Sequence, residues 1–536
     1  MKLLSRSVFF AAALSLSLLS GCTCSRDAEL APGELYMGNG AEPKDLDPHI
    51  TTGIPEHHIQ QNIFEALVSV DPKTLAPVPG VAESWTLAKD GRTYTFKLRA
   101  DAKWSNGDPV VAQDFVYAWT RLLKPETASE YAYQGYYIVG GKDYNTGKSK
   151  EPKLGVEAVD DRTLKVTLVN PTPFFLGLLY HHSLYPVHRK TIEAHGAKWT
   201  RPENIVTNGA FRVSRWETNK IITLVPNEHY WDRANVKLKA VHFLPIENLD
   251  TEEKMFRSGK LHVTNEVPLE KLPSWQKDTT GVYQSAPYLG TYFYWINTKK
   301  KPLDDKRVRK ALNLAFDREQ LVKHVTKGGQ LPGNVFVPPG TGGLQVKPML
   351  PTDLSRVAEA KKLLAEAGYP DGKGMPPLEI LYNTHEGHKK IAEALQQMWK
   401  TNLGVNVTLF NQEWKVYLDS MRQMQFHLGR QGWIGDYNDP NTFLDLLVSD
   451  NGNNRSGFKS AKYDALIEQA GKEHNAAKRL AIFQQAEEML ADELPVIPMY
   501  IYTRNYLKRN DVKGWYPNVQ DFHPLKYVYI EEEVKK

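Results

Sequence analysis

An arginine and an aspartate flank a short run of small and apolar residues in the segment GRQGWIGDYNDP, residues 429–440. Arg430 and Asp436 could form a catalytic pair, a structural ion pair, or the two ends of a site for a ligand that carries both charges. If the segment is extended, Gly432 and Ile434 share the parity of the two charged residues, and these backbone groups point to one edge. A peptide could add along that edge while the aspartate pairs with its α-ammonium. Such a site would bind peptides of many sequences, but the pattern alone is equally consistent with a local turn that uses Asp436.

Other groups of reactive residues do not match an enzyme or metal motif. The segment GKDYNTGKS, residues 141–149, has five residues between its glycines where a phosphate loop has four. HEGH at 385–388 misses the spacing of a zinc protease by one residue, and the adjacent histidines of EHH (56–58) and YHH (180–182) point different ways on any regular element. No GxSxG is present. We therefore predict no catalytic residue, metal or cofactor, and leave open a metal or carboxylate pair assembled from distant segments.

The beginning of the chain has the layout of an export signal. Two basic residues precede an apolar run over residues 8–19, and LSGC at 19–22 resembles a bacterial lipobox. We expect residues 1–21 to be a signal peptide and Cys22 to be lipidated, which would anchor the protein at the periplasmic or extracytoplasmic face of a bacterial membrane. An ordinary cleaved signal with an incidental cysteine is the alternative. Cys24 has no evident role.

Length and charge narrow the class of protein. A chain of 536 residues is too long for one core and predicts two or three lobes. Lys and Arg number 67 against 62 Asp and Glu, and this near balance gives no reason to expect nucleic-acid binding. The 26 Tyr and 12 Trp residues suit a binding surface of amphipathic aromatics, although packing could explain most of them.

Strands dominate the part of the chain that precedes the first long helical pattern. Residues 93–100 (TYTFKLRA) and 163–170 (TLKVTLVN) alternate between apolar and polar side chains, as strands do. Asn208-Gly209 predicts a hairpin, followed by a strand in IITLVPN at 221–227. This part therefore reads as a mixed, strand-rich region.

From about residue 304 the pattern changes to helices that alternate with strands. A helix in residues 353–372 ends at Gly368. The helix HKKIAEALQQMWKTNLG (388–404) leads into the strand VNVTLF (405–410). Such helix-to-strand units are typical of an α/β lobe, which would have to position the residues of the opening segment.

Seven ordered blocks make the chain similar to a known family. They cover residues 80–119, 204–216, 304–319, 360–372, 383–390, 411–418 and 429–440, within a likeness that runs from ELYMGNGAEPKDLDPHI to YVYIEEE. The chain resembles the oligopeptide-binding lipoproteins of bacterial ABC importers, in extracellular solute-binding protein family 5. The resemblance implies an α/β, three-lobed fold like that of the type II (Venus-flytrap) periplasmic binding proteins, with mixed sheets flanked by helices.

The resemblance also implies how the chain is divided. Residues 22–34 would be the lipidated N-terminus and linker, and residues 65–185 would be lobe II. Lobe III would be residues 289–503, and lobe I would combine residues 35–64, 186–288 and 504–536. Lobes I and III would close over the ligand, with lobe II as an accessory to lobe I.

In that family an aspartate of the GWxxDYN block binds the peptide α-ammonium, and here this is Asp436. Cations meet ligand carboxylates in peptides of different lengths, and Arg430 and His388 match two of them. Backbone pairing with the peptide would come from Gly432 and Ile434 on one side and from the region of Ile54 on the other. Aromatic pocket positions, each of which could equally be a packed structural aromatic, match Trp433, Trp414 and Tyr131.

Two positions depart from the family pattern. Thr326 stands where the family has a lysine used for short peptides, with Lys327 adjacent, so dipeptide binding is in doubt. Thr52 stands where the family has an acidic residue, which would change the preference for basic side chains.

The resemblance implies a non-enzymatic, monomeric receptor that captures oligopeptides largely independently of their side chains. Its partners would be the peptide, a membrane permease with separate ATPase subunits, and the membrane through the lipid anchor, but no nucleic acid. A murein peptide, an opine or a signalling peptide stays open as the solute. From other classes, an exported hydrolase and a surface adhesin or chaperone are the alternatives.

Overall fold

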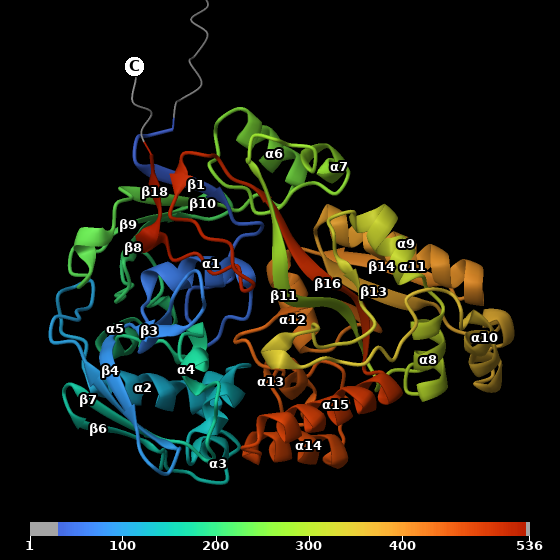
Figure 1. The fold of residues 1–536 in the computed structure, drawn as a ribbon, viewed down its shortest axis with the longest axis horizontal. Helices are drawn as coiled ribbons and strands as arrows, with labels where there is room; N and C mark the ends of the chain where they lie inside the picture. Colours follow the sequence, from blue (N-terminus) through green and yellow to red (C-terminus); the bar gives the residue numbers. More distant parts are fainter. Residues whose placement is uncertain (1–29, 532–536) are drawn as a thin grey trace, which may run out of the picture.

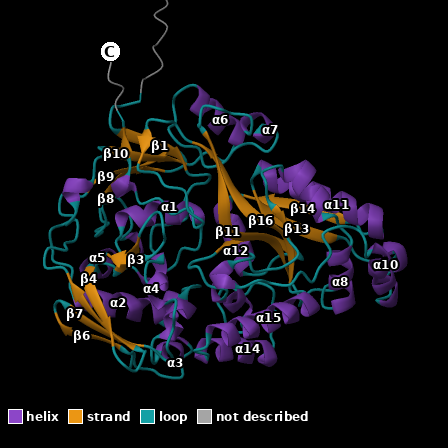
Figure 2. Cartoon of the chain, viewed as in Figure 1, coloured by secondary structure: helices purple, strands orange, loops and turns teal. Residues whose placement is uncertain are grey.

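The computed structural model describes residues 30–531. The predicted signal peptide, Cys22 and Cys24 lie outside these residues. The described chain forms an α/β fold with three larger sheets, two small two-stranded sheets and helices around them (Figures 1 and 2). Over residues 30–531, no helix is long and apolar enough to span a bilayer.

The first sheet has the strand order β1-β10-β9-β8. Its strands are β1 (Glu34–Gly38), β8 (Phe211–Glu217), β9 (Ile221–Pro226) and β10 (Ala240–Leu244). Strand β1 pairs with β10 in parallel, and the other neighbours are antiparallel. A small pair of β17 (Val512–Lys513) and β18 (Tyr529–Ile530) lies beside it, so segments from both ends of the chain meet here (Figure 1).

The predicted hairpin at Asn208-Gly209 is wrong in position. Strand β8 begins after it, and the β8–β9 turn contains Asn219, whose φ is 57°. The Asn208 side chain instead bonds both backbone groups of Glu65, at 3.0 and 2.8 Å. A Cβ atom on Gly209 would lie 2.5 Å from the carbonyl carbon of Ile63. The Asn-Gly pair therefore serves a close approach between two distant segments and not a turn.

The second sheet is antiparallel, with the order β4-β5-β7-β6. Its strands are β4 (Ala82–Leu87), β5 (Thr93–Leu98), β6 (Val156–Asp160) and β7 (Thr163–Thr167). The two strands predicted from alternation, at 93–100 and 163–170, are confirmed as β5 and β7, which pair with each other. A two-stranded sheet of β2 (Val68–Val70) and β3 (Pro77–Pro79) precedes it.

The third sheet is mixed, with the order β12-β16-β11-β15-β13-β14. Its strands are β11 (Tyr283–Ile296), β12 (Leu331–Pro332), β13 (Leu378–Asn383), β14 (Val407–Gln412), β15 (Leu428–Ile434) and β16 (Val496–Leu507). The long antiparallel strands β11 and β16 run from beside helices α6 and α7 into this sheet (Figure 1). Their register shifts between Pro287 and Thr291, so the paired strands are interrupted there.

Helices pack around the sheets. Their bounds are α1 (Ile54–Ile63), α2 (Ala112–Leu123), α3 (Gly141–Asn145), α4 (Phe175–Leu178), α5 (Arg189–His195), α6 (Leu249–Arg257), α7 (Leu272–Trp275), α8 (Lys306–Leu314), α9 (Arg318–Gln320), α10 (Val357–Glu366), α11 (Glu386–Leu403), α12 (Trp414–Arg422), α13 (Asn441–Leu444), α14 (Ala461–Lys472) and α15 (Ala476–Glu493). The helix-to-strand unit predicted at 388–410 is confirmed, because α11 joins the parallel strands β13 and β14.

Strand β11 has buried apolar side chains on both faces of the third sheet. Phe293 and Trp295 pack into one core with α12 to α15, while Tyr292, Tyr294 and Ile296 pack into another with α8, α10 and α11. Alternate side chains of a strand point to opposite faces, so a sheet covered on both faces needs apolar residues at every position.

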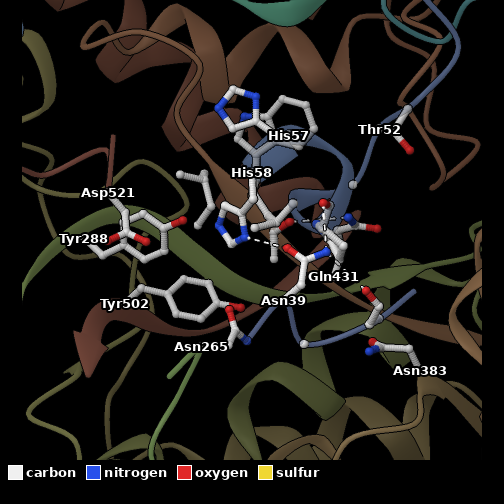
Figure 3. A pocket seen from close by; sticks show the side chains of 18 of the residues that line it. Asn39, Thr52, His57, His58, Asn265, Tyr288, Asn383, Gln431, Tyr502 and Asp521 are labelled. Atoms are coloured by element: carbon white, nitrogen blue, oxygen red, sulfur yellow. Dashed lines mark hydrogen bonds between the residues drawn. The ribbon is translucent and has the colours of Figure 1, made fainter. Parts of the chain in front are cut away.

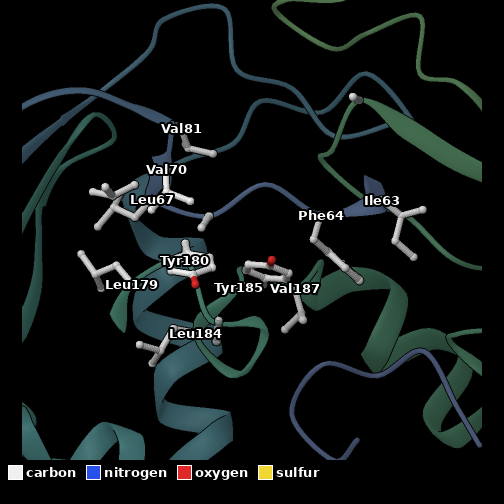
Figure 4. Packing of buried hydrophobic residues seen from close by; sticks show 14 of the residues in the cluster. Ile63, Phe64, Leu67, Val70, Val81, Leu179, Tyr180, Leu184, Tyr185 and Val187 are labelled. Atoms are coloured by element: carbon white, nitrogen blue, oxygen red, sulfur yellow. The ribbon is translucent and has the colours of Figure 1, made fainter. Parts of the chain in front are cut away.

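The first and second sheets share one core. A single hydrophobic cluster contains Leu35 and Phe243 of the first sheet and Phe96 and Val166 of the second. Figure 4 shows the part of this cluster in which residues of the segment 63–81 pack against residues 179–187. The first two sheets are therefore packed together, whereas most buried residues of the third sheet belong to two other clusters.

Candidate ligand-binding site

A cavity of about 250 Å³ lies between the start of α1 and strand β15. It brings together all nine residues that the sequence predicted for ligand binding: Ile54, Tyr131, His388, Trp414, Arg430, Gly432, Trp433, Ile434 and Asp436. Figure 3 shows further lining residues, among them His57 and His58 of α1, Tyr288 of β11 and Tyr502 of β16. Segments from across the chain therefore build one site.

Strand β15 offers an edge to this cavity. Its pairing with β13 covers only Leu428 and Gly429, while its pairing with β11 continues to Ile434. The Gly435 amide donates to the Leu289 carbonyl of β11 at 2.8 Å. Because alternate residues of an antiparallel strand address opposite edges, Gly432 and Ile434 address the edge away from β11. The segment is therefore extended over Leu428–Ile434, and some of its backbone groups face the cavity.

Asp436 follows this strand, and its side chain is 9% exposed. Its Oδ2 accepts a hydrogen bond of 2.8 Å from the Gln134 amide, and its Oδ1 lies 3.4 Å from His181 Nε2. Burial raises the pKa of the Asp436 carboxyl well above its ordinary value, against a lowering by the Gln134 hydrogen bond. Among residues 30–531, no lysine or arginine forms an ion pair with it. The site holds a buried acid that lacks a cation.

The neighbouring histidine is held in its neutral form. The Ser183 backbone amide donates to His181 Nδ1 at 3.4 Å, which leaves the proton of a neutral ring on Nε2, facing Asp436. Burial, with His182 and His57 nearby, lowers the pKa of His181 well below its ordinary value. Neutral donors orient the Asp436 carboxyl group without supplying a counter-charge, which a cationic ligand group could supply.

Arg430 occupies the other end of the segment. Its Nη2 donates to the Tyr502 hydroxyl at 2.8 Å, and its guanidinium lies 4.6 Å from the centroid of the Tyr292 ring. Its Nε has no hydrogen-bond partner, and no carboxylate pairs with it, among the described residues. A Cβ atom on Gly432 would lie 2.4 Å from the Tyr502 oxygen, so the glycine permits this arrangement. The Arg430 guanidinium could therefore bind an anionic group of a ligand.

His388 and the aromatic residues form the rest of the predicted set. Burial, and then Arg430 and His385, lower the pKa of His388 well below its ordinary value, so its ring is neutral in this structure. Trp433 and Tyr131 are buried, with ring centroids 6.1 Å apart. Trp414 Nε1, at the cavity wall, donates a hydrogen bond of 3.3 Å to Glu56 Oε1 of α1. These rings supply apolar walls.

The two departures from the family pattern differ in position. Thr52 lines the cavity. Thr326 is buried outside it, where its hydroxyl contacts Gln330 Oε1 at 2.9 Å, and Lys327 does not line the cavity either. Neither Thr326 nor Lys327 places a cation in the cavity.

Several residues of the site were missed by sequence reasoning. Gln134 and His181 contact Asp436 from more than 250 positions away in the chain. Tyr292 and Tyr502 surround Arg430 from two other strands. YHH at 180–182 was noted only as a poor metal motif. No group of three or more metal-ligating side chains that could hold an ion occurs over the described range, although six histidines line the cavity: His57, His58, His181, His182, His385 and His388.

The fold and the cavity are those of a solute-binding protein. Residues 76–455 match the model of the middle region of the bacterial extracellular solute-binding proteins, family 5, and the chain belongs to this family. The periplasmic oligopeptide-binding protein OppA of Salmonella typhimurium is 42% identical over 503 residues, which are 93% of this chain and 91% of that protein. The match confirms the predicted family.

Solved structures agree with the predicted fold. Haemophilus influenzae OppA in complex with RPPGFSPFR superposes with a TM-score of 0.90 at 38% identity, over 94% of this chain and all of that one. The Escherichia coli murein tripeptide binding protein MppA also gives 0.90, at 39% identity and with 94% and 100% of the two chains covered. The unliganded open form of MppA gives only 0.63 over 94% and 98%. The present structure therefore has its parts arranged unlike the open form.

Proposed function

We propose that the protein captures oligopeptides outside the cytoplasm and delivers them to an ABC permease whose ATPase subunits are separate chains. One observation carries the proposal: within residues 30–531, the buried acid Asp436 has no cationic partner and the partly buried cation Arg430 has no acidic partner, and the two stand at opposite ends of a segment whose backbone faces the cavity. A zwitterionic, extended ligand matches all three features at once. Family membership supports the same conclusion.

The roles of the residues follow from this match. Asp436 pairs with the peptide α-ammonium, and Arg430 or His388 meets the carboxylate, according to ligand length. Gly432 and Ile434 bond the peptide backbone from one side. Ile54 begins α1, where backbone N–H groups are not used within the helix, and it bonds the peptide from the other side. Pockets for side chains are walled by Trp433, Trp414 and Tyr131.

The binding movement involves three lobes with the boundaries predicted above. The three larger sheets, each drawn mainly from one predicted lobe, support this division. Lobe II moves with lobe I, since their sheets share one core. Gln134 and His181 reach Asp436 only when lobes II and III are together, so the ligand and the closed form stabilise each other.

The first experiment is native mass spectrometry of the purified protein, followed by sequencing of the small molecules that denaturation releases. We expect intact peptides, one per protein, which free-amine peptides displace and N-acetylated peptides do not. Fragmented peptides would indicate a hydrolase instead. A murein tripeptide in the same displacement assay distinguishes a receptor like MppA, because it would then displace the others at much lower concentration.

The anchor and the oligomeric state complete the proposal. Cys22 carries the lipid after removal of residues 1–21, as LSGC indicates, and the protein acts as a monomer. The support is the sequence alone. Mass spectrometry of the mature N-terminus should find a diacylated cysteine, and an unmodified N-terminus would refute the anchor.

A further inference from the structure

A second cavity, of about 760 Å³, lies away from the peptide site. Its walls come from residues 133–148, from residues 169–174 and from the stretch 441–479 that includes α14. In Figure 1, α3 and α14 lie beside each other at the opposite end of the molecule from the chain termini. Its volume falls within the range of about 300–1,000 Å³ that is common for small-molecule sites.

One buried acid in its wall is incompletely bonded. Asp445 is 5% exposed, and its Oδ2 contacts Asn441 Nδ2 at 3.1 Å and the Tyr137 hydroxyl at 3.3 Å. Its Oδ1 is buried and has no hydrogen-bond partner anywhere in the described chain. No basic side chain of residues 30–531 pairs with it, whereas the rim residue Asp450 is paired with Lys142 at 2.8 Å. Burial raises the pKa of the Asp445 carboxyl well above its ordinary value.

Aromatic rings line the part of the cavity beside Asp445, while charged side chains, among them Lys142, Lys472 and Arg479, line other parts of it. The rings of Tyr137 and Phe174 meet edge to face, with centroids 5.2 Å apart. Val169 is 45% exposed at the same cavity. Aromatic rings attract both apolar groups and ammonium ions, and a buried carboxyl without a cation is stabilised by a ligand that supplies one. The walls and the acid thus favour the same kind of molecule.

We propose that this cavity binds a small primary amine, with its ammonium group on Asp445 and its apolar body against Tyr137 and Phe174. The site is separate from the peptide cavity, and the proposal does not depend on peptide binding. A ligand that lacks the ammonium group would leave the buried carboxyl uncompensated. It would therefore bind more weakly than the amine.

Isothermal titration with 2-phenylethylamine tests this, with 2-phenylethanol as the neutral analogue. We expect one amine per protein and an alcohol affinity at least about tenfold lower. Asp445→Asn should lower amine affinity at least about tenfold, because the isosteric amide keeps an acceptor for Asn441 but has no charge. Asp450→Asn, at the paired rim acid, should change it less than about twofold.

Two further measurements keep the test decisive. Circular dichroism of Asp445→Asn checks that the variant is folded, and Asp436→Asn locates the site. Amine binding that survives Asp436→Asn and is lost in folded Asp445→Asn supports the proposal. No amine binding to the wild-type protein, equal affinity for the alcohol, loss of binding in Asp436→Asn, or retention in Asp445→Asn would overturn it.

Discussion

The two ends of the peptide cavity hold opposite charges in different surroundings. Asp436 is contacted by the neutral groups of Gln134 and His181, which arrive from the body formed by the first two sheets. Arg430 lies among tyrosines of its own sheet, with the Tyr502 hydroxyl at 2.8 Å. The acid end therefore combines groups from distant parts of the fold, while the contacts of the basic end come from the third sheet. We therefore expect peptide binding to depend strictly on the charge of Asp436 and, according to the ligand, less strictly on the charge of Arg430.

Replacing the acid should have the largest effect. In Asp436→Asn the α-ammonium of a bound peptide would be desolvated without a counter-charge, and removal of one partner of such a pair typically costs about 3–5 kcal/mol. Calorimetric titration of wild type and variant with one peptide measures the difference. Asp143→Asn, at an exposed aspartate outside the cavity, is the control and should bind normally. A loss smaller than tenfold would contradict a strict acid end.

Replacing the base should have a smaller effect that depends on the ligand. Arg430→Met should weaken a peptide whose carboxylate reaches Arg430 by about 2–3 kcal/mol, the usual worth of hydrogen bonds to charged groups. The same peptide with an amidated C-terminus should lose little, since it has no carboxylate to pair. Affinities of both peptides for both proteins give the answer. Equal losses for the two peptides would mean that Arg430 has a structural role.

The residues at the two ends also differ in how well the sequence could predict them. Local patterns were sufficient for β5, for β7 and for the α11 unit, because neighbours in the chain determine these features, and the parity of Gly432 and Ile434 followed once their segment proved to be extended. The assignments of Asp436, Arg430 and His388 came from family resemblance and not from periodicity. Gln134 could not be predicted, since it is 302 positions from its partner and a single polar residue carries no local signal. Asn208-Gly209 failed for the same reason: a distant segment decides its role.

Acid should destabilise the end that contains Asp436. Burial lowers the pKa of His57 to about 4. In the unfolded state His57 takes up a proton with the ordinary histidine pKa of about 6.5, so between pH ~6.5 and about 4 the unfolded state binds more protons than the folded state. The free energy of unfolding is therefore highest above pH ~6.5 and falls as the pH is lowered towards about 4, by up to about 1.4 kcal/mol per pH unit. Unfolding free energies measured in urea at pH 7 and pH 5 should differ less in His57→Gln than in wild type.

The exposed His474 provides the control for this pH dependence. His474→Gln should keep the wild-type difference between pH 7 and pH 5, because an exposed histidine is not desolvated on folding. If both variants retained the full difference, His57 would not be a source of acid sensitivity, and the contrast between the two ends would lose this support.

The smallest predicted change concerns the contact between Gln134 and Asp436. Gln134→Leu removes a donor 2.8 Å from the carboxylate, which the His181 ring still approaches, so peptide affinity should fall by about 1 kcal/mol. Gln396→Leu is a matched control, since the Gln396 amide donates to Val407 at 2.7 Å in the third sheet, away from the cavity. Titration of both variants with one peptide compares them. Gln134 reaches Asp436 from outside the third sheet, so its loss should also favour the open form. Small-angle scattering of the peptide-bound protein would detect that shift. An unchanged peptide affinity would show that Asp436 is oriented without Gln134.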